Sequence, residues 1–157
     1  MTDLYVIGVD PGPSTGIFVA RNGFRFAVFQ GEPVPALDSL TALFRTLYED
    51  KERVHVACER YVSSSQPGRT HQPVPQQVIG AMTVLATNLG YPVTMQSPAD
   101  AKRIAPNELL RRLGFYVMRG EVERPDANDV NDAARHAVLL LMTRYATVLE
   151  KRLNAQP

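Results

Sequence analysis

The pattern of apolar and polar positions at the start of the chain predicts three strands joined by tight turns. Residues 4–9 are almost all apolar, as is typical of a strand buried on both faces. This strand ends on Asp10, and a turn rich in Gly and Pro returns the chain into a second apolar run at residues 17–19. Residues 24–29 alternate well enough for a third strand. An antiparallel meander is therefore expected to open the domain.

Helical and strand patterns alternate in the middle of the chain. After a connector over residues 31–35, Leu and aromatic residues at helical spacing predict a core-facing helix over 37–48. Residues 54–59 form the next strand, and a second helix is expected over 76–89. Between these two elements, residues 63–73 have no apolar period and predict a polar loop.

The last third of the chain is predicted to contain one short strand and otherwise helices. Residues 92–96 form the strand, and Ser97 is placed to cap a helix with Pro at its first position. Asn107 is expected to cap a second short helix that ends at Gly114, and irregular chain is expected over residues 115–127.

A final long helix is predicted from near Asp129 to about Leu153. Its core face is expected to carry Ala133, Val138, Leu141, Met142, Tyr145 and Leu149. A strand meander followed by alternating strands and helices implies an α/β fold, a mixed five-stranded sheet with helices on both faces. A single domain over residues 1–157 is the simplest organisation at this length.

Composition excludes some classes of protein. The net charge is +1, so the protein as a whole does not attract nucleic acid, although basic residues outnumber acidic ones between positions 60 and 124. That segment either lines a phosphate-binding face or is a solvated surface. Cys58 is the only cysteine, which excludes internal disulfides and thiolate zinc clusters, and it is expected to be a small buried hydrophobe. With no run long enough to span a membrane and no signal-peptide pattern, a soluble, cytoplasmic protein without a membrane partner is expected.

Two of the predicted strands end on a carboxylate, Asp10 and Glu59. If these strands are adjacent and parallel, both acids lie at the same edge of the sheet. Burying a carboxylate there costs free energy unless a positive partner meets it, and a metal ion is the commonest such partner. For Asp10 the alternative is a turn cap that accepts hydrogen bonds from backbone amides.

Asp129 and Asp132 form a second acidic pair, three residues apart on one face of the last helix. By themselves they fit an interaction with the helix dipole at least as well as a metal site. Together with Asp10 and Glu59 they make four carboxylates without a matching basic cluster, and Mg²⁺ or Mn²⁺ would relieve the repulsion. Two ions roughly 3.5–4 Å apart would clamp the attacking water and the leaving oxygen of a phosphodiester.

Three stretches follow one another along the chain: G-V-D-P-G-P-S-T-G-I at 8–17, V-A-C-E-R-Y at 56–61, and D-V-N-D-A-A-R-H-A at 129–137. In this order and spacing they resemble the motifs of the RuvC-type Holliday junction resolvases of the RNase H-like superfamily, and are most similar to the short bacteriophage-encoded members. The resemblance implies a Mg²⁺-dependent endodeoxyribonuclease active in DNA recombination and repair, without a nucleotide cofactor. It also implies four metal ligands: Asp10, Glu59, Asp129 and Asp132.

The resemblance implies partners as well. In that family a homodimer nicks two opposing strands of a four-way junction, so branched DNA and a second copy of the chain are expected in a bacterial or phage-infected cell. The helix over 76–89 is the implied dimer surface. Residues expected to bind nucleic acid are Arg60, Tyr61, Arg69, Lys102, Arg103, Arg111 and Arg112.

Two residues near these motifs, Lys102 and His136, have more than one interpretation, and a third, Tyr61, is one place away from the family's position. Lys102 falls where the family has a basic residue beside the scissile phosphate, but it also fits a surface lysine on a capped helix. Tyr61 is the nearest aromatic residue to the position that the family associates with opening the junction. His136, one turn after Asp132, either orients a ligand or a water or lies on the helix surface.

Other functions share this fold core. The turn after Asp10 also resembles the phosphate loop of actin-like ATPases and sugar kinases, but those proteins enclose a nucleotide between two such domains and this chain supplies one. A non-catalytic module that binds nucleic acid or protein has no need to hold four mutually repelling carboxylates. An RNase H or flap-type nuclease of the same superfamily stays open, because the sequence does not separate its substrate from a four-way junction.

Overall fold

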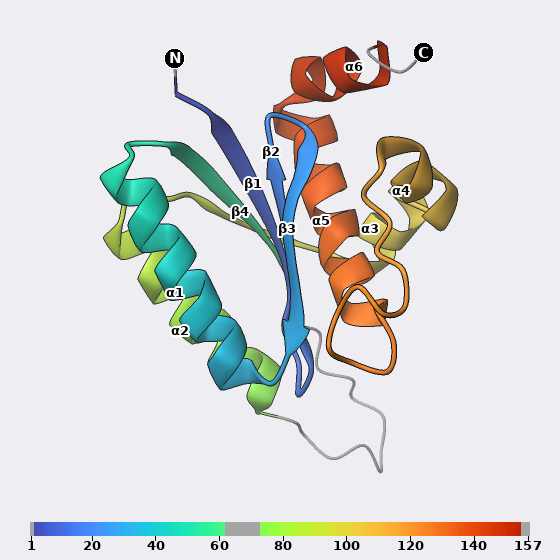
Figure 1. Cartoon of the computed structure of the whole chain (residues 1–157). Coiled ribbons are helices and arrows are strands. Elements are labelled where there is room, and N and C mark those ends of the chain that lie inside the picture. The colour runs from blue at the N-terminus through green and yellow to red at the C-terminus, as the bar shows by residue number, and fades with distance from the viewer. Residues whose placement is uncertain (1, 62–72, 155–157) are drawn as a thin grey trace.

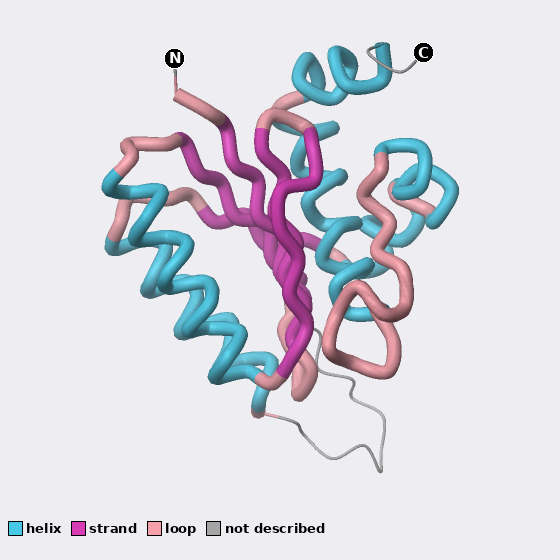
Figure 2. The backbone as a smooth tube through the Cα atoms, in the orientation of Figure 1, coloured by secondary structure: helices cyan, strands magenta, loops and turns pink. Residues whose placement is uncertain are grey.

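The computed structural model describes residues 2–61 and 73–154, which form a five-stranded sheet with helices on both faces (Figure 1). The sheet order is β3-β2-β1-β4-β5. The first three strands along the chain pair antiparallel, whereas β1, β4 and β5 run parallel to one another. Figure 2 shows the strands gathered between helices on either side. Both the meander and the mixed sheet are confirmed. The strands are β1 Leu4–Asp10, β2 Thr15–Arg21, β3 Phe24–Gly31, β4 Arg53–Glu59 and β5 Val93–Gln96.

The helices form two layers, one on each face of the sheet (Figure 1). On one face lie α1 (Pro33–Glu49) and α2 (Val74–Asn88), packed side by side. On the other face α5 (Asn128–Arg144) crosses the sheet, with α3 (Pro98–Ile104) and α4 (Asn107–Leu113) beyond it. The last helix, α6 (Ala146–Asn154), follows the C-terminal end of α5.

Alternation along β1 explains why its apolar run is continuous. Leu4 and Val6 belong to the core cluster beneath α5. Tyr5, Ile7 and Val9 belong to the cluster beneath α1 and α2. Successive side chains of a strand point to opposite faces, so a strand covered on both faces needs an apolar residue at every position.

Two glycines let α5 approach the sheet closely. A Cβ atom at Gly8 of β1 would overlap the carbonyl oxygen of Ala133, and one at Gly16 of β2 would overlap the backbone of Asp129. Both obstacles are backbone atoms of α5, which cannot move aside as a flexible side chain can. The N-terminal turns of α5 therefore lie directly on β1 and β2.

Two helix starts differ from the sequence prediction. The helix α1 begins at Pro33, inside the expected connector over 31–35, because Pro lacks only an N–H that the first turn does not use. Asn107 was expected as a cap but is the first residue of α4, and its side chain instead accepts a hydrogen bond from Arg135. The cap at Ser97 is confirmed, since its hydroxyl accepts from the Asp100 amide at 3.5 Å.

The predicted final helix is two helices. The chain bends at Tyr145, whose φ of −137° and ψ of 39° are not helical, and the Tyr145 hydroxyl lies 2.9 Å from Nδ1 of His55. No Gly or Pro marks this position, so the sequence carried no signal for it. Met142, expected in the core, is 42% exposed, whereas the other predicted core positions of α5 and α6 are buried or partly buried.

Three further predictions concern Cys58, the polar loop and membrane spans. Cys58 is buried as expected, and burial is the main cause that raises the pKa of its thiol. The polar loop predicted over 63–73 falls almost entirely outside the described residues. No helix in the described part of the chain is long and apolar enough to cross a membrane.

The close approach of α5 predicts that Gly8→Ala lowers the free energy of unfolding. The new methyl group has to displace backbone of α5, and overpacking of this kind costs about 1–3 kcal/mol or more. Ser39→Ala is the control, because Ser39 is exposed on α1 and alanine has a higher helix propensity than serine, so no loss of stability is expected. Urea unfolding at equal protein concentration measures both, and an unchanged midpoint for Gly8→Ala would contradict the close packing.

Candidate active site

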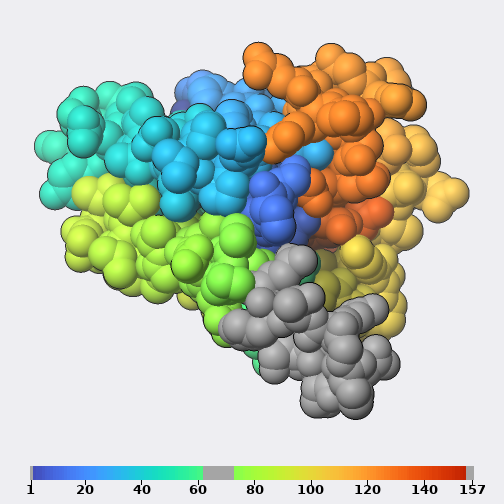
Figure 3. Space-filling view, turned by 90° about the horizontal axis from the view of Figure 1, so that it is seen from below, coloured from blue at the N-terminus to red at the C-terminus, as the bar shows by residue number. Residues whose placement is uncertain are grey.

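Asp10 and Glu59 end neighbouring parallel strands at one edge of the sheet. Val9 of β1 pairs with Cys58 of β4, so the two acids follow at the same level. Figure 3 views the molecule from this end, where the turn after β1 lies between α1 and α2 on one side and the start of α5 on the other. Parallel pairing thus brings both acids to the edge on which α5 begins.

The turn that follows Asp10 is stabilised by Thr15. The Thr15 hydroxyl donates a hydrogen bond to the Gly12 carbonyl oxygen at 2.8 Å, and the Gly12 amide donates to the same hydroxyl at 3.4 Å. Among the described residues, the Asp10 carboxylate has no hydrogen bond. The turn-cap interpretation of Asp10 therefore lacks the contacts it requires.

Burial and neighbouring negative charge both oppose ionisation of Asp10. Burial is the largest cause, and together with Glu59, Asp132 and Asp129 it raises the pKa of Asp10 to about 8, although Lys102 lowers it. Each of the other three acids therefore lies close enough to Asp10 to affect its charge. The four carboxylates form one electrostatic group.

Asp129 lies in the first turn of α5, where its backbone crosses Gly16 of β2. Burial raises the pKa of Asp129, and Asp126 and Asp132 add to this. Ser14 and Arg124 lower this pKa, but by less than burial and the two acids raise it. Asp129 therefore lies in a partly buried site among other acids.

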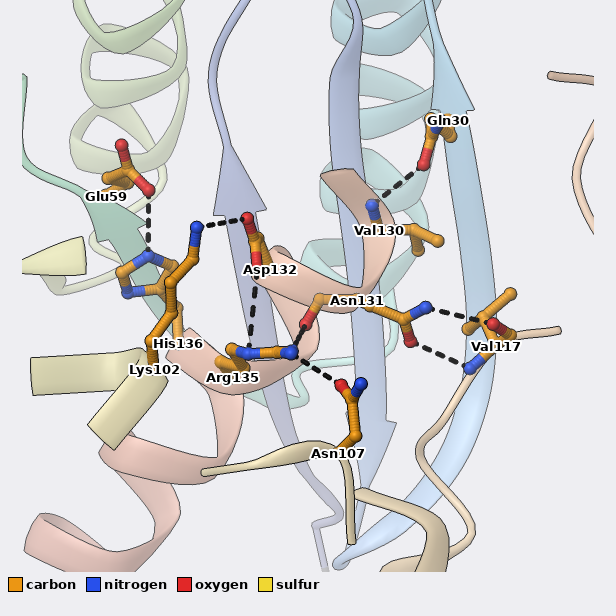
Figure 4. Close-up of polar contacts among 10 residues, drawn as sticks. All are labelled: Gln30, Glu59, Lys102, Asn107, Val117, Val130, Asn131, Asp132, Arg135 and His136. Carbon is orange, nitrogen blue, oxygen red and sulfur yellow. Dashed lines mark hydrogen bonds and ion pairs between the residues drawn. The ribbon is translucent and has the colours of Figure 1, made fainter. Parts of the chain in front are cut away.

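Asp132 lies between two cationic side chains (Figure 4). Lys102 of α3 places Nζ 3.0 Å from Asp132 Oδ2, and Arg135 places Nε 3.6 Å from Oδ1. The Lys102 side chain is 59% exposed, so solvent screens this pair and it contributes only about 0–1 kcal/mol. Its position is nevertheless informative, because it places Lys102 against an acid of the group rather than on an unrelated surface.

His136 is buried and connects Glu59 to β5. Its Nε2 lies 3.4 Å from Glu59 Oε2, and its Nδ1 lies 2.9 Å from Gln96 Oε1 (Figure 4 shows the first contact). Only 1% of His136 is exposed, so the helix-surface interpretation is wrong. Both ring nitrogens are thus engaged, and the two contacts fix the orientation of the imidazole ring.

Gln96 is the site residue that the sequence analysis missed. It is buried, ends β5, and pairs in register with Glu59. The signal was available: three parallel strands end on polar residues, and Gln96 is the third after Asp10 and Glu59. Gln96 was not among the predicted site residues because an uncharged amide, unlike a carboxylate, cannot neutralise the charge of a metal ion.

The chemistry of the donor set fits a hard divalent cation, because Mg²⁺ and Mn²⁺ prefer carboxylate oxygen and this group has an excess of negative charge. The side chains are not gathered into a finished site, however. Within residues 2–61 and 73–154, no three His, Cys, Asp or Glu side chains stand close enough together to hold an ion. Asp132 is held by Lys102 and Arg135 instead. Cation binding by this set therefore requires side chains to rearrange.

The basic residues predicted to bind nucleic acid have different surroundings. Arg60 follows β4 directly and is exposed. Arg103 pairs with Asp100 at 3.1 Å, and the Arg111 guanidinium lies 4.2 Å from the ring centroid of Tyr116. Lys102 is joined to the acid group by its ion pair with Asp132. Tyr61 and Arg112 are also described, whereas Arg69 lies outside the described residues.

Comparisons with known proteins found similarity in structure. No protein-family model and no curated protein sequence matches the chain. The structure of Thermus thermophilus RuvC has a TM-score of 0.61 and 18% identity, over 91% of this chain and 97% of that one. T. thermophilus RuvC in complex with a Holliday junction substrate has a TM-score of 0.59 and 19% identity, over 92% of this chain and 97% of that one. The chain therefore has the α/β RNase H-like fold in the form that RuvC has, as the motifs predicted.

Proposed function

We propose that this chain is a divalent-metal-dependent endonuclease that resolves four-way DNA junctions, with a homodimer making paired nicks. The observation that carries the proposal is the convergence of Asp10, Glu59, Asp129 and Asp132 at one edge of a RuvC-like fold. One of the similar RuvC structures is a complex with a Holliday junction substrate, which supports branched DNA as the substrate class by analogy of fold.

The four carboxylates would hold two Mg²⁺ or Mn²⁺ ions. When bound, such ions supply Lewis-acid activation of a water and of the phosphodiester. The chain itself fixes the positions of the acids. Glu59 is oriented by His136, which Gln96 holds in turn, so a buried hydrogen-bonded chain supports one ligand.

The cationic residues would divide between chemistry and binding. Lys102 would contact the scissile phosphate, and its ion pair with Asp132 supports this role because it brings the ammonium group next to a proposed metal ligand. Exposed arginines would neutralise backbone phosphates, which supplies affinity without sequence information. The residues assigned to DNA binding are Arg60, Tyr61, Arg69, Lys102, Arg103, Arg111 and Arg112.

A homodimer through α2 is part of the proposal, because two symmetric nicks need two active sites at a fixed separation. The helix packs on the sheet through Val78, Met82 and Ala86. On its outer side Val84 is 57% exposed, and nothing lies within 4 Å of the place that a Cβ of Gly80 would take. An exposed valine beside an open glycine suits close packing against a second copy of the helix.

Asp10→Asn and Glu59→Gln test the metal assignment. Each removes a charged ligand, so each is expected to slow cleavage in Mg²⁺ by at least roughly 10²–10³-fold, the scale of losing one preorganised transition-state contact. The assay compares a four-way junction, a flap, a duplex and an RNA–DNA hybrid side by side. The control is Asp38→Asn, an exposed acid on α1 on the other face of the sheet. Near-parental cleavage by either site variant would contradict the assignment, and preference for a flap or hybrid would replace the four-way junction as substrate.

Stability without metal should depend on pH through Asp10. The pKa of Asp10 is about 8 in the folded chain and about 4 when unfolded, so the folded state binds the extra proton between these values. Stability in EDTA is therefore expected to fall as pH rises from about 4 to about 8, by at most about 1.4 kcal/mol per pH unit, and to level off above. Asp10→Asn should remove this fall and be more stable than the parent at pH 8. Parallel pH profiles for the two proteins would show that Asp10 ionises normally.

Lys102→Ala and Arg111→Ala should separate chemistry from binding. Lys102→Ala is expected to bind a junction almost normally yet cleave it about 10²-fold more slowly. Arg111→Ala is expected to weaken binding to all DNA and to lower the salt slope by roughly 0.9, with the rate of the bound enzyme nearly unchanged. Single-turnover cleavage at saturating enzyme decides, with Lys151→Ala on α6 as the control. A parental rate for Lys102→Ala would leave carboxylates and metal as the whole catalytic group.

A further inference from the structure

The helix α5, which carries Asp129 and Asp132, begins without a capping side chain of its own. The residue before it is Ala127, and no side-chain cap is formed there. The first amides of a helix have no partner inside the helix, so groups from elsewhere have to accept hydrogen bonds from them. At the start of α5 the Val130 amide donates to the side chain of Gln30 at 2.9 Å, across 100 residues of sequence (Figure 4). A residue of β3 therefore takes the place of the missing cap.

Gln30 is hydrogen-bonded to the start of α5 at two points. Its Oε1 accepts from the Val130 amide, and its Nε2 donates to the Asp126 carbonyl oxygen, also at 2.9 Å. A backbone N–H only donates and a carbonyl oxygen only accepts, so these two partners fix which way the side-chain amide points. Only 5% of Gln30 is exposed, so its loss would leave two backbone groups without their buried partner. Asp129 lies between the two residues that Gln30 binds.

The strand register relates these two hydrogen bonds to Asp10. Asp10 pairs with Gly16 of β2, and Gly16 pairs with Gln30 of β3, so the three residues form one row across the sheet. Residues in register on neighbouring strands point to the same face, which here is the face that α5 covers. Gly16 lets the backbone of Asp129 lie against this row, and Gln30 fixes the helix start there. The row thus sets where the backbone of Asp129 lies relative to Asp10.

The neutral amide of Gln30 suits this position better than a carboxylate. A glutamate could accept from the Val130 amide but, when ionised, could not donate to the Asp126 carbonyl oxygen. It would also add a negative charge near Asp129, where burial and two other acids already oppose ionisation. Glutamine makes both hydrogen bonds and adds no charge to the acid group.

We infer that Gln30 is a positioning residue of the acid group, which sets the place of Asp129 relative to Asp10 and thereby the affinity of the group for a divalent cation. The inference rests on the proposed function and adds to it a residue that acts through the backbone of α5. Within the described part of the chain the acidic side chains have to rearrange to hold an ion, so the backbone position from which Asp129 turns decides whether its oxygens reach that ion. Loss of a residue that orients a metal ligand typically weakens metal binding by about 10- to 100-fold.

The test is Gln30→Met, which keeps an unbranched side chain of similar volume and removes both hydrogen bonds. Binding of Mn²⁺ to the protein without DNA is measured from the electron paramagnetic resonance signal of the free ion, a readout that does not depend on cleavage. The dissociation constant is expected to rise about 10- to 100-fold. Gln30→Asn keeps the amide but is one methylene shorter and cannot reach both partners, so it is expected to raise the constant by a smaller factor. It replaces Gln30→Met if that variant does not fold.

Leu47→Val is the control for a general loss of stability, because Leu47 of α1 is buried on the other face of the sheet. It is expected to lower the melting temperature and to leave the Mn²⁺ dissociation constant at the parental value. In single-turnover cleavage of a four-way junction, Gln30→Met should need correspondingly more Mn²⁺ than the parent to reach half of its maximal rate, whereas Leu47→Val should not.

Two results would overturn the inference and leave the proposed function in place. One is a parental Mn²⁺ dissociation constant in the folded Gln30 variant, and the other is an equal rise in Leu47→Val. A parent that binds no Mn²⁺ would overturn the inference together with the cation site, and the proposed function would fail as well if this parent cleaves no branched DNA. The two failures are distinguishable, because the first appears only in the variants and the second already in the parent.

Discussion

The candidate site depends on how closely α5 lies on β1 and β2. Gly8 and Gly16 leave no atom between the strands and the helix backbone, so the separation is set by backbone contact. Asp129 and Asp132 lie in the turns of α5 that this contact positions, above strands that end on or pair with Asp10. The packing of α5 on the sheet therefore also sets the geometry of the site, and a side chain added at Gly8 or Gly16 would change both.

The same contact creates an electrostatic conflict. It covers Asp10 and brings the α5 acids near it, so that burial first, and then Glu59, Asp132 and Asp129, raise the pKa of Asp10 to about 8. Lys102 and Arg135 pair with Asp132, and Lys102 also lowers the pKa of Asp10, but by less than burial and the other acids raise it. Destabilising arrangements of side chains are concentrated at functional sites, because a group that lowers stability is retained where the function requires it. The unrelieved part of this charge is therefore the best structural argument for a cation.

Sequence reasoning went furthest where one physical rule dominates. Strands covered on both faces must be apolar throughout, and parallel neighbours end at the same edge, so the sheet and the position of Asp10 and Glu59 at one edge were predictable. It failed where distant contacts decide. The last predicted helix is interrupted at Tyr145, whose hydroxyl contacts His55. The side chain of Asn107 accepts a hydrogen bond from Arg135 instead of capping α4. No local pattern shows these partners.

The contacts that escaped prediction have a common origin in α5. Most of this helix is buried apolar surface, so each polar residue that it buries has to find a partner outside the helix. Asn131 is hydrogen-bonded to Val117 in the segment after α4, Arg135 to Asn107 of α4, and His136 to Gln96 of β5. Each bond fixes another element around the acids while leaving the acids on α5 and the strands. The positions of these elements relative to the acids therefore depend on the polar residues that α5 buries.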